Sequence, residues 1–170
     1  TAGAHVEELS LSGLDEIMGL SHGAQEFVAH EILQEAIDNH PDIISDYVPE
    51  LLETALSFNS SDFRKSTSLA GEIWQSHLGP LFQDYEALLC PTVSSPLVPA
   101  ENWQKQKIII NGHALTDTEM TMTGLFNLYS RCPVLSLPSG MTDDALPCGL
   151  QIIGRPCDDV TVFQIGAALE

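Results

Sequence analysis

Apolar residues in the first half of the chain recur at helical spacing. The stretch 14–37 has this period and predicts helical structure, with interruptions near Gly19 and Gly23. Pro41 and Pro49 each fit the first turn of a short helix, where the missing N–H of proline costs nothing. Residues 6–9 are instead expected to form the end of a short strand.

A longer helix is predicted to begin at the polar cluster 59–62, Asn-Ser-Ser-Asp, because such side chains cap helix N-termini. The residues expected to form its buried stripe are Phe63, Ala70, Ile73, Trp74, His77 and Leu81. On this interpretation, His77 is a core histidine and not a ligand.

The apolar period changes after residue 86. Continuous apolar runs at 87–90, 134–137 and 148–153 predict buried strands, since each is bounded by Pro or Gly. Asn111-Gly112 lies between two short apolar runs and predicts a hairpin with a type I′ turn. The remaining elements are expected to be a helix over 116–128 and a C-terminal helix capped by Asp158-Asp159.

These elements predict one α/β domain over residues 1–170. Its first part, 1–86, is mainly helical, and its second part, 87–170, mixes strands with helices. Strands without alternation of apolar and polar residues indicate a sheet covered by helices on both faces. A chain of 170 residues with 44% hydrophobic residues is long enough to form such a core.

The charge of the chain narrows the choice of partners. The formal net charge is −18, and residues 1–63 hold 13 acidic residues and no Lys or Arg. Such a surface repels phosphate backbones, so a nucleic-acid partner is excluded. The acidic segment is either a solvated helix face or a surface that selects partners. No apolar run approaches the roughly 20 residues that span a bilayer, so no membrane association is expected.

Four cysteines in a chain of this length do not form a disulfide scaffold. Cys90 and Cys132 lie in apolar runs and are interpreted as small buried hydrophobes, which suits a reducing compartment. The first four residues show neither the basic nor the long apolar part of a secretory signal. The expected location is therefore the cytoplasm.

The residues alone give few candidates for chemistry. Ser139, in a Pro-Ser-Gly turn after a predicted strand, is either a nucleophile or a strand-ending turn residue. His22, Glu26 and His30 share a helix face but are better explained as solvated polar groups, so no metal site is expected. The sequence has no P-loop and no Gly-x-Gly-x-x-Gly pattern, so no cofactor is expected.

Three blocks of the second half resemble the amidase signature family. They are Ala87–Thr92 (ALLCPT), Phe126–Gly140 with its CPVLSLPSG ending, and Leu146–Pro156 (LPCGLQIIGRP). The resemblance is to the C-terminal third of these enzymes and extends more weakly over the first half. It implies the C-terminal part of the amidase-signature fold, with a mixed sheet covered by helices on both faces.

The resemblance also implies amide hydrolysis by a triad of Ser, cis-Ser and Lys, with backbone N–H groups stabilising the oxyanion. This chain has no Gly-Gly-Ser-Ser-Gly-like loop, so no catalytic residue is assigned to it. The residues that the resemblance places at the substrate pocket are Pro91, Thr92, Thr123, Phe126 and Asn127. For Thr92 the alternative is a strand-end turn, and for Phe126 it is ordinary core packing.

The expected function is that of a C-terminal segment of an amidase-like hydrolase acting on carboxamide C–N bonds, inactive alone, whose parent enzyme takes a small amide substrate. The alternative is a non-catalytic binding or assembly subunit of a split amidase or amidotransferase. A sheet separated from its neighbouring strands exposes an unpaired edge. Homo-oligomers formed through that edge are therefore expected unless a helix covers it.

Overall fold

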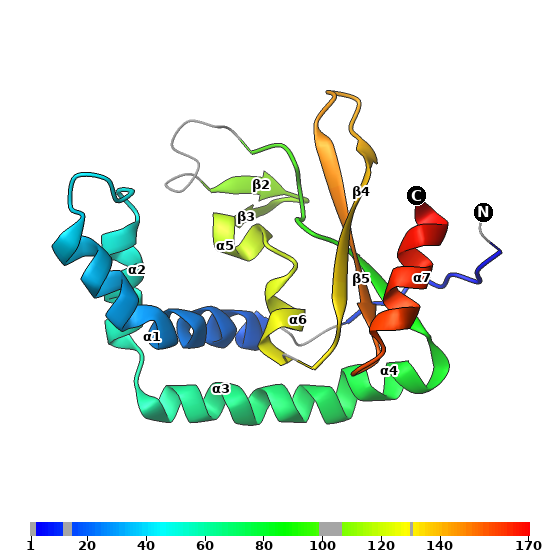
Figure 1. Ribbon diagram of the computed structural model, residues 1–170, viewed down its shortest axis with the longest axis horizontal. Helices are drawn as coiled ribbons and strands as arrows, with labels where there is room; N and C mark the ends of the chain where they lie inside the picture. Colours follow the sequence, from blue (N-terminus) through cyan, green and yellow to red (C-terminus); the bar gives the residue numbers. More distant parts are fainter. Residues whose placement is uncertain (1–2, 12–14, 99–106, 130) are drawn as a thin grey trace. The chain divides into compact units, whose positions relative to one another are not determined.

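The computed structural model describes residues 3–11, 15–98, 107–129 and 131–170. Two compact units can be distinguished along the chain. Unit 1 comprises residues 1–13 and 73–170, and unit 2 comprises residues 14–72. Figure 1 shows the elements of both units in sequence colours.

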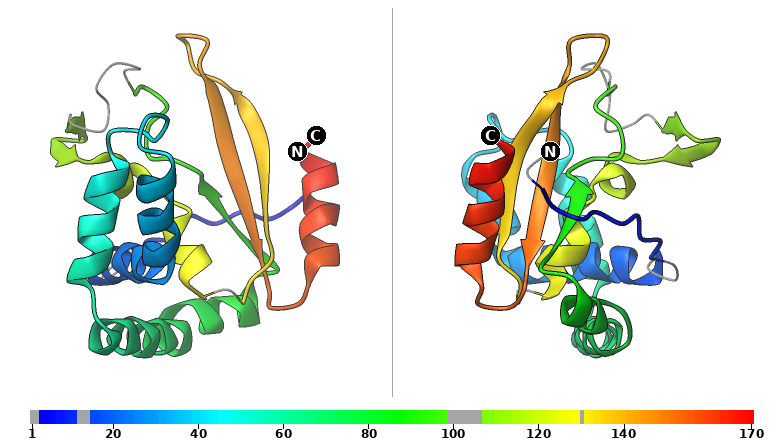
Figure 2. Two further views of the ribbon diagram at one scale, coloured as in Figure 1. Left: turned by 60° about the vertical axis from the view of Figure 1, so that its left-hand side comes forward. Right: turned by 90° about the vertical axis from the view of Figure 1, so that its right-hand side faces the viewer.

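Among the described residues of unit 2, all regular secondary structure is helical. Its helices are α1 (Asp15–Asn39), α2 (Val48–Ser57) and α3 (Ser60–Ile73, the last residue of which begins unit 1). α1 packs beside α2, as the left panel of Figure 2 shows. The ring of Phe27 on α1 lies 6.2 Å from that of Phe58 and 6.0 Å from that of Phe63. This aromatic cluster joins the three helices.

α1 continues through both glycines at which the sequence predicts interruptions. Gly23 has a packing role, because a Cβ at this position would lie 2.5 Å from the Phe58 ring. The glycine therefore lets the two helices approach closely and does not break α1. Pro49 lies in the first turn of α2 as predicted, whereas the residues after Pro41 form only a turn.

The cap predicted at Asn59 is confirmed. Its side-chain Oδ1 accepts hydrogen bonds from the N–H groups of Ser61 (2.8 Å) and Asp62 (3.2 Å). The Asp62 carboxylate in turn accepts from the Asn59 N–H at 3.2 Å. This reciprocal pair satisfies N–H groups that the first turn of α3 leaves without helical partners.

The predicted buried stripe is wrong at Phe63, which is 38% exposed. It is wrong again beyond Trp74, where the cause is a π-helix, η1, over Trp74–Leu78. It precedes α4 (Gly79–Asp84), whose second residue is Pro80. A proline within a helix cannot donate to the preceding turn and clashes with its carbonyl, and a wider π turn relieves both problems. The extra residue shifts the buried positions by one: Leu78 and Phe82 are 1% and 8% exposed, whereas His77 is exposed and Leu81 half-buried.

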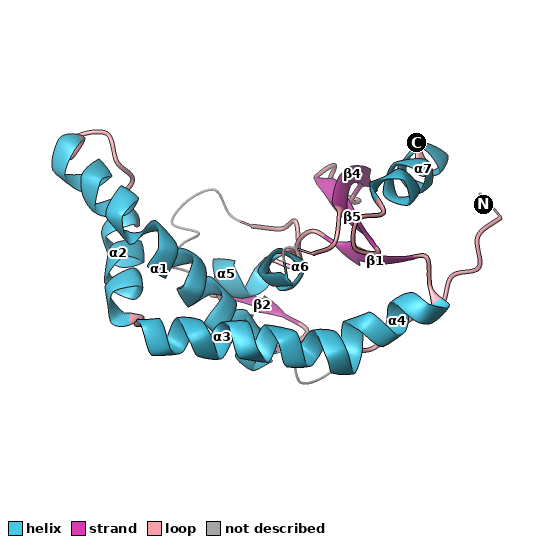
Figure 3. Ribbon diagram, turned by 60° about the horizontal axis from the view of Figure 1, so that its bottom comes forward, coloured by secondary structure: helices cyan, strands magenta, loops and turns pink. Residues whose placement is uncertain are grey.

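Unit 1 contains a three-stranded sheet in the order β1-β5-β4. The strands are β1 (Ala87–Pro91), β4 (Val134–Met141) and β5 (Pro147–Gly154). Figure 3 shows the strands in magenta among the cyan helices. The last four residues of β5, 151–154, are buried whichever face they point to, as expected for a covered sheet.

The α/β class is confirmed, but the strand pairs in the described ranges are antiparallel instead of mixed. For β4 and β5 the reason is local, because the short turn 142–146 that joins these two strands permits only antiparallel pairing. β4 also continues past Pro138, where the sequence predicts a strand end, through a β-bulge between Pro138 and Gly140.

Helix α7 (Asp159–Leu169) packs on β4 and β5. The predicted cap is present, since the Asp158 carboxylate accepts a hydrogen bond from the Thr161 N–H. Two glycines allow the close approach. A Cβ on Gly154 would lie 2.3 Å from Val162, and one on Gly166 would lie 2.5 Å from Leu135.

The Asn-Gly hairpin is confirmed as β2 (Ile108–Ile110) and β3 (His113–Leu115). Asn111 and Gly112 have φ angles of 50° and 82°, as a type I′ turn requires. The single helix expected over 116–128 is instead two short helices, α5 (Asp117–Met120) and α6 (Gly124–Tyr129). The break between them belongs to the candidate site described below.

The strand expected at residues 6–9 is absent, and this segment has no regular structure. Glu7 instead accepts a hydrogen bond from the Tyr85 hydroxyl, and this bond, aided by His5, lowers the pKa of Glu7. None of the helices within the described ranges has both the length and the apolar character needed to cross a bilayer.

Candidate functional site

Three segments of unit 1 meet where β1 ends: the end of the first sequence block, the third block on β5, and residues 120–122 between α5 and α6, which lie before the second block. Thr92, directly after β1, donates its N–H to the Gly149 carbonyl of β5 at 3.1 Å. On its other side, the Thr92 carbonyl accepts from the Met122 N–H at 3.0 Å. The chain at Thr92 is therefore hydrogen-bonded on both sides, to β5 and to the segment between α5 and α6.

The pairing of these two segments continues beyond Thr92. Val93 and Thr121 form an antiparallel bridge, and the Ser94 N–H donates to the Met120 carbonyl at 2.9 Å. This strand-like pairing explains why the helix expected over 116–128 is interrupted. Residues that bond to another segment cannot use the same backbone groups within a helix.

The side chain of Gln151 on β5 joins both segments. It is 1% exposed, and its Nε2 donates to the carbonyl oxygens of Pro91 (3.0 Å) and Met122 (2.9 Å). Its Oε1 is buried and has no hydrogen-bond partner among the described residues. Sequence patterns alone assign no role to Gln151. Its position inside the apolar run 150–153 nevertheless indicates a polar side chain that is buried with its neighbours.

Gly149 is required by the position of Thr92. A Cβ at Gly149 would lie 2.4 Å from the Thr92 Oγ1, so the threonine side chain occupies the space above this glycine. Thr92 is half-buried there. The glycine of the Leu-Pro-Cys-Gly-Leu-Gln block thus sets the contact between β5 and the residue after β1.

The structure brings together some of the five predicted pocket residues. Pro91 is exposed, and Thr92 and Thr123 are half-buried near the joined segments. Phe126 on α6 is 6% exposed, which favours the core-packing alternative for its ring. Asn127 also lies on α6, but its side chain is outside the described part of the structure. For these residues, contact with a substrate stays a prediction.

The arginine of the Gly-Arg-Pro block has a structural contact. The Nη2 of Arg155 donates to the Tyr85 carbonyl at 3.1 Å, which joins the end of β5 to the chain just before β1. Both ends of β1 are thus held by side chains from the last sequence block.

Ser139 lies at the β-bulge of β4 and is exposed. A serine nucleophile needs a base within hydrogen-bond reach. Within the described ranges, the Ser139 hydroxyl donates no hydrogen bond to a histidine or lysine. Its position therefore matches the alternative interpretation, a turn-forming residue.

The four cysteines are free thiols. Burial raises the pKa of Cys90 above its usual value, although the nearby Gln151 side chain lowers it in part. Burial also raises the pKa of Cys132, with a smaller opposing effect from the charge of Arg131. Because the thiolate is the reactive form, neither environment favours nucleophilic chemistry.

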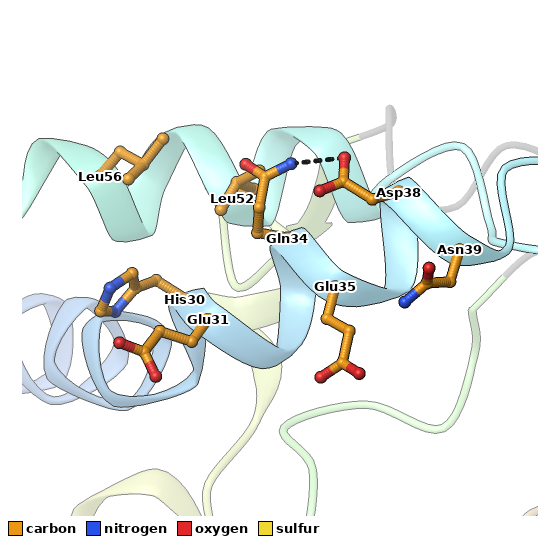
Figure 4. Close-up of a pocket in the computed structure, with 8 residues that line it drawn as sticks. All are labelled: His30, Glu31, Gln34, Glu35, Asp38, Asn39, Leu52 and Leu56. Atoms are coloured by element: carbon orange, nitrogen blue, oxygen red, sulfur yellow. Dashed lines mark hydrogen bonds between the residues drawn. The ribbon is translucent and has the colours of Figure 1, made fainter.

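Unit 2 contains a hollow between α1 and α2, shown in Figure 4. The residues that line it are His30, Glu31, Gln34, Glu35, Asp38, Asn39, Leu52 and Leu56. Gln34 donates to Asp38 at 3.0 Å, and His30 Nδ1 is bonded to the Phe27 carbonyl at 2.7 Å. No group of three residues suited to a metal ion occurs among the described residues. The hollow is an acidic surface without a built ligand site.

Comparisons with known proteins show which fold these segments belong to. Along 98% of its length, the chain superposes on a solved amidase with a TM-score of 0.80 and 26% sequence identity, and it covers 37% of that protein. The fold is thus that of a part of an amidase. The sequence model of the Amidase family matches residues 12–163, and the chain belongs to this family.

Two relatives extend this finding. The chain is 31% identical over 116 residues to the fatty acid amide hydrolase of Arabidopsis thaliana, which is 67% of this chain and 18% of that protein. It is 26% identical over 139 residues to the acylamidase of Rhodococcus erythropolis, or 78% of this chain and 28% of that protein. The chain thus spans less than a third of each of these two relatives.

Proposed function

We propose that this chain is the C-terminal segment of an amidase-like hydrolase that acts on the carboxamide C–N bond of a small substrate in the cytoplasm. In this proposal it supplies part of the core sheet and one wall of the substrate site. The observation that carries it is the junction of Thr92, Met122 and Gln151, since it joins the first and third family blocks to the segment that precedes Thr123. The names of the relatives support the choice of an amide substrate.

The catalytic groups are proposed to lie outside this sequence. A Ser, cis-Ser and Lys triad needs a lysine that can exchange a proton with the bridging serine. The lysines of the sequence are Lys65, Lys105 and Lys107, of which Lys65 and Lys107 are exposed. The contribution of this chain is then to bind and orient the amide, which lowers the entropic part of the barrier.

A fluorophosphonate probe tests this division of roles, because it reacts with activated serines. We expect no covalent mass increase on the 170-residue chain, and full labelling of a longer protein in which a family sequence with the Ser-rich loop precedes it. Intact-protein mass spectrometry reads out both. A mass increase on the chain itself would contradict the proposal, and a Ser139→Ala variant would then show whether Ser139 is the labelled residue.

We also propose an assembly role, since the edges of the sheet support it. Among the described residues, β4 pairs only with β5, and its outer edge carries Val134 and Met141, which are 40% and 68% exposed. Unpaired strand edges with apolar side chains tend to pair with another chain. A relative from Granulibacter bethesdensis is named as one subunit of a glutamyl-tRNA(Gln) amidotransferase, which supports the same idea.

Sedimentation at increasing protein concentration measures this association. We expect the wild-type chain to form dimers or larger species in about 0.15 M salt, which screens the net charge of −18. Val134→Lys should shift the protein to monomer, because a charge at the edge opposes strand pairing. Val160→Lys is the matched control, since Val160 is 66% exposed on α7. A wild-type chain that remains monomeric at all concentrations would disprove self-association through this edge.

A further inference from the structure

Gln151 is a buried polar side chain whose contacts reach both candidate wall segments. We propose that Gln151 is a positioning residue: its amide sets the distance between the chain at Thr92 and the chain at Thr123, and thereby the width of the substrate site. The proposal rests on the proposed function for the substrate, but the geometric part can be tested without it.

A single nitrogen atom of Gln151 contacts both segments. Nε2 carries two hydrogens, and it reaches two carbonyl oxygens, of Pro91 at 3.0 Å and of Met122 at 2.9 Å. These acceptors belong to segments 31 residues apart in the sequence. Both partners are acceptors, so the amide nitrogen and not the oxygen must face them. One side chain thus holds two backbone segments at a fixed separation.

This arrangement has an energetic cost. Gln151 is 1% exposed, and its Oε1 is buried without a partner in the described part of the chain. A buried acceptor without a donor is unfavourable, and an apolar side chain of similar length would avoid the cost. The neighbours Ile152 and Ile153 fill their positions with apolar side chains at 0% exposure. The amide at position 151 is therefore explained by its two bonds and not by packing.

The two bonds lie next to two of the predicted pocket residues. The Pro91 carbonyl belongs to the peptide group of Thr92, and the Met122 carbonyl to that of Thr123. Fixing these carbonyls fixes the backbone from which both threonine side chains project. If Gln151 is removed, the Thr92–Met122 backbone bond remains but can open without the amide that spans it.

Backbone hydrogen exchange of the chain itself tests the geometric part at pH 7. The reporters are the N–H groups of Met122 and Ser94, which form the bonds between the two segments. We expect Gln151→Met to lower their protection about tenfold, with protection in α7 unchanged. Gln151→Asn keeps the amide but is one methylene shorter, so it should reach one carbonyl and give an intermediate loss. Ile153→Val, on the same strand, is the control for general loosening and should leave both reporters near wild type.

Steady-state kinetics of amide hydrolysis tests the substrate part, in a protein that contains this chain together with the Ser-rich loop. We expect Gln151→Met to raise KM about tenfold with kcat changed less than about threefold, because the wall binds the substrate but carries no reacting group. Gln151→Asn should recover part of KM. A purely structural role would lower the amount of active enzyme, and thus the apparent kcat, with KM unchanged.

The outcomes separate the two proposals. Unchanged exchange at Met122 and Ser94 in Gln151→Met overturns the positioning role altogether. Faster exchange with an unchanged KM overturns the effect on the substrate site. Faster exchange in a protein that hydrolyses no amide overturns the proposed function, and with it the substrate part, while the geometric role of Gln151 stands.

Discussion

Ile152→Ala is expected to destabilise the chain by about 2–5 kcal/mol, which is the range for removing a large aliphatic side chain from a packed core. Ile152 is 0% exposed at the centre of the three-stranded sheet. It lies opposite Leu89 on β1 and Leu135 on β4, so the cavity would adjoin all three strands. For a chain of this size, each kcal/mol corresponds to about 2–4 °C in the melting temperature. Thermal unfolding followed by circular dichroism measures the effect.

The matched control for this prediction is Ile109→Ala. Ile109 lies on β2 and is 67% exposed, so its loss should change stability by less than about 0.5 kcal/mol. Equal destabilisation by the two substitutions would mean that the three-stranded sheet is not the core of unit 1.

Gly154→Ala is expected to destabilise the chain by about 2–3 kcal/mol, through overpacking and not through a cavity. The added Cβ would lie 2.3 Å from a methyl group of Val162, and the Asp158 carbonyl would lie 3.3 Å away. Val162 is β-branched and 2% exposed, so its side chain cannot turn to another rotamer to avoid the added methyl group. Helix α7 must therefore move away from the sheet. Urea unfolding at pH 7 measures the loss.

Two further variants identify the cause of that loss. Gly71→Ala on α3 meets nothing within 4 Å, and it should stabilise the chain by about 0.5–1 kcal/mol, because alanine favours helix. Adding Val162→Ala to Gly154→Ala should recover part of the loss, since it removes the clashing methyl groups. If the double variant were less stable than the wild type by the full sum of the two single losses, the contact would not be the cause.

The elements that could be predicted from the sequence are those fixed by local chemistry. The Asn59 cap and the Asn111-Gly112 turn depend on side chains and φ angles within a few residues, and both are present. The apolar runs of β1, β4 and β5 also predict strands correctly. The continuous burial expected for these strands is present only at the end of β5, because β1 and β4 have exposed positions along their length.

The elements that could not be predicted depend on distant contacts. The helix over 116–128 is interrupted because Thr121 and Met122 bond to the chain near Thr92, which no local pattern shows. Local sequence marks Gly23 as an interruption, although the ring that requires this glycine belongs to Phe58, beyond the next helix.

In the candidate site, too, some residues can be predicted from local sequence and others depend on distant contacts. Pro91 and Thr92 can be found from sequence because the family resemblance marks the end of a strand. Gln151 cannot, because its role depends on two carbonyls from other segments. Periodicity indicates which face of an element is apolar, but it does not identify which buried polar side chains hold two backbone segments together.

The π turn at Trp74–Leu78 has a consequence for how related sequences can differ in length. Insertion of one residue into an ordinary α-helix rotates everything after it by about 100°, which would turn the apolar side of the helix away from the core. A π turn accommodates the additional residue within a single turn, so that Leu78 and Phe82 still face inward. Homologues that lack this residue could therefore keep the same core with a regular helix. An alignment across residues 74–78 should then allow a gap of one position, even though the segment is helical throughout.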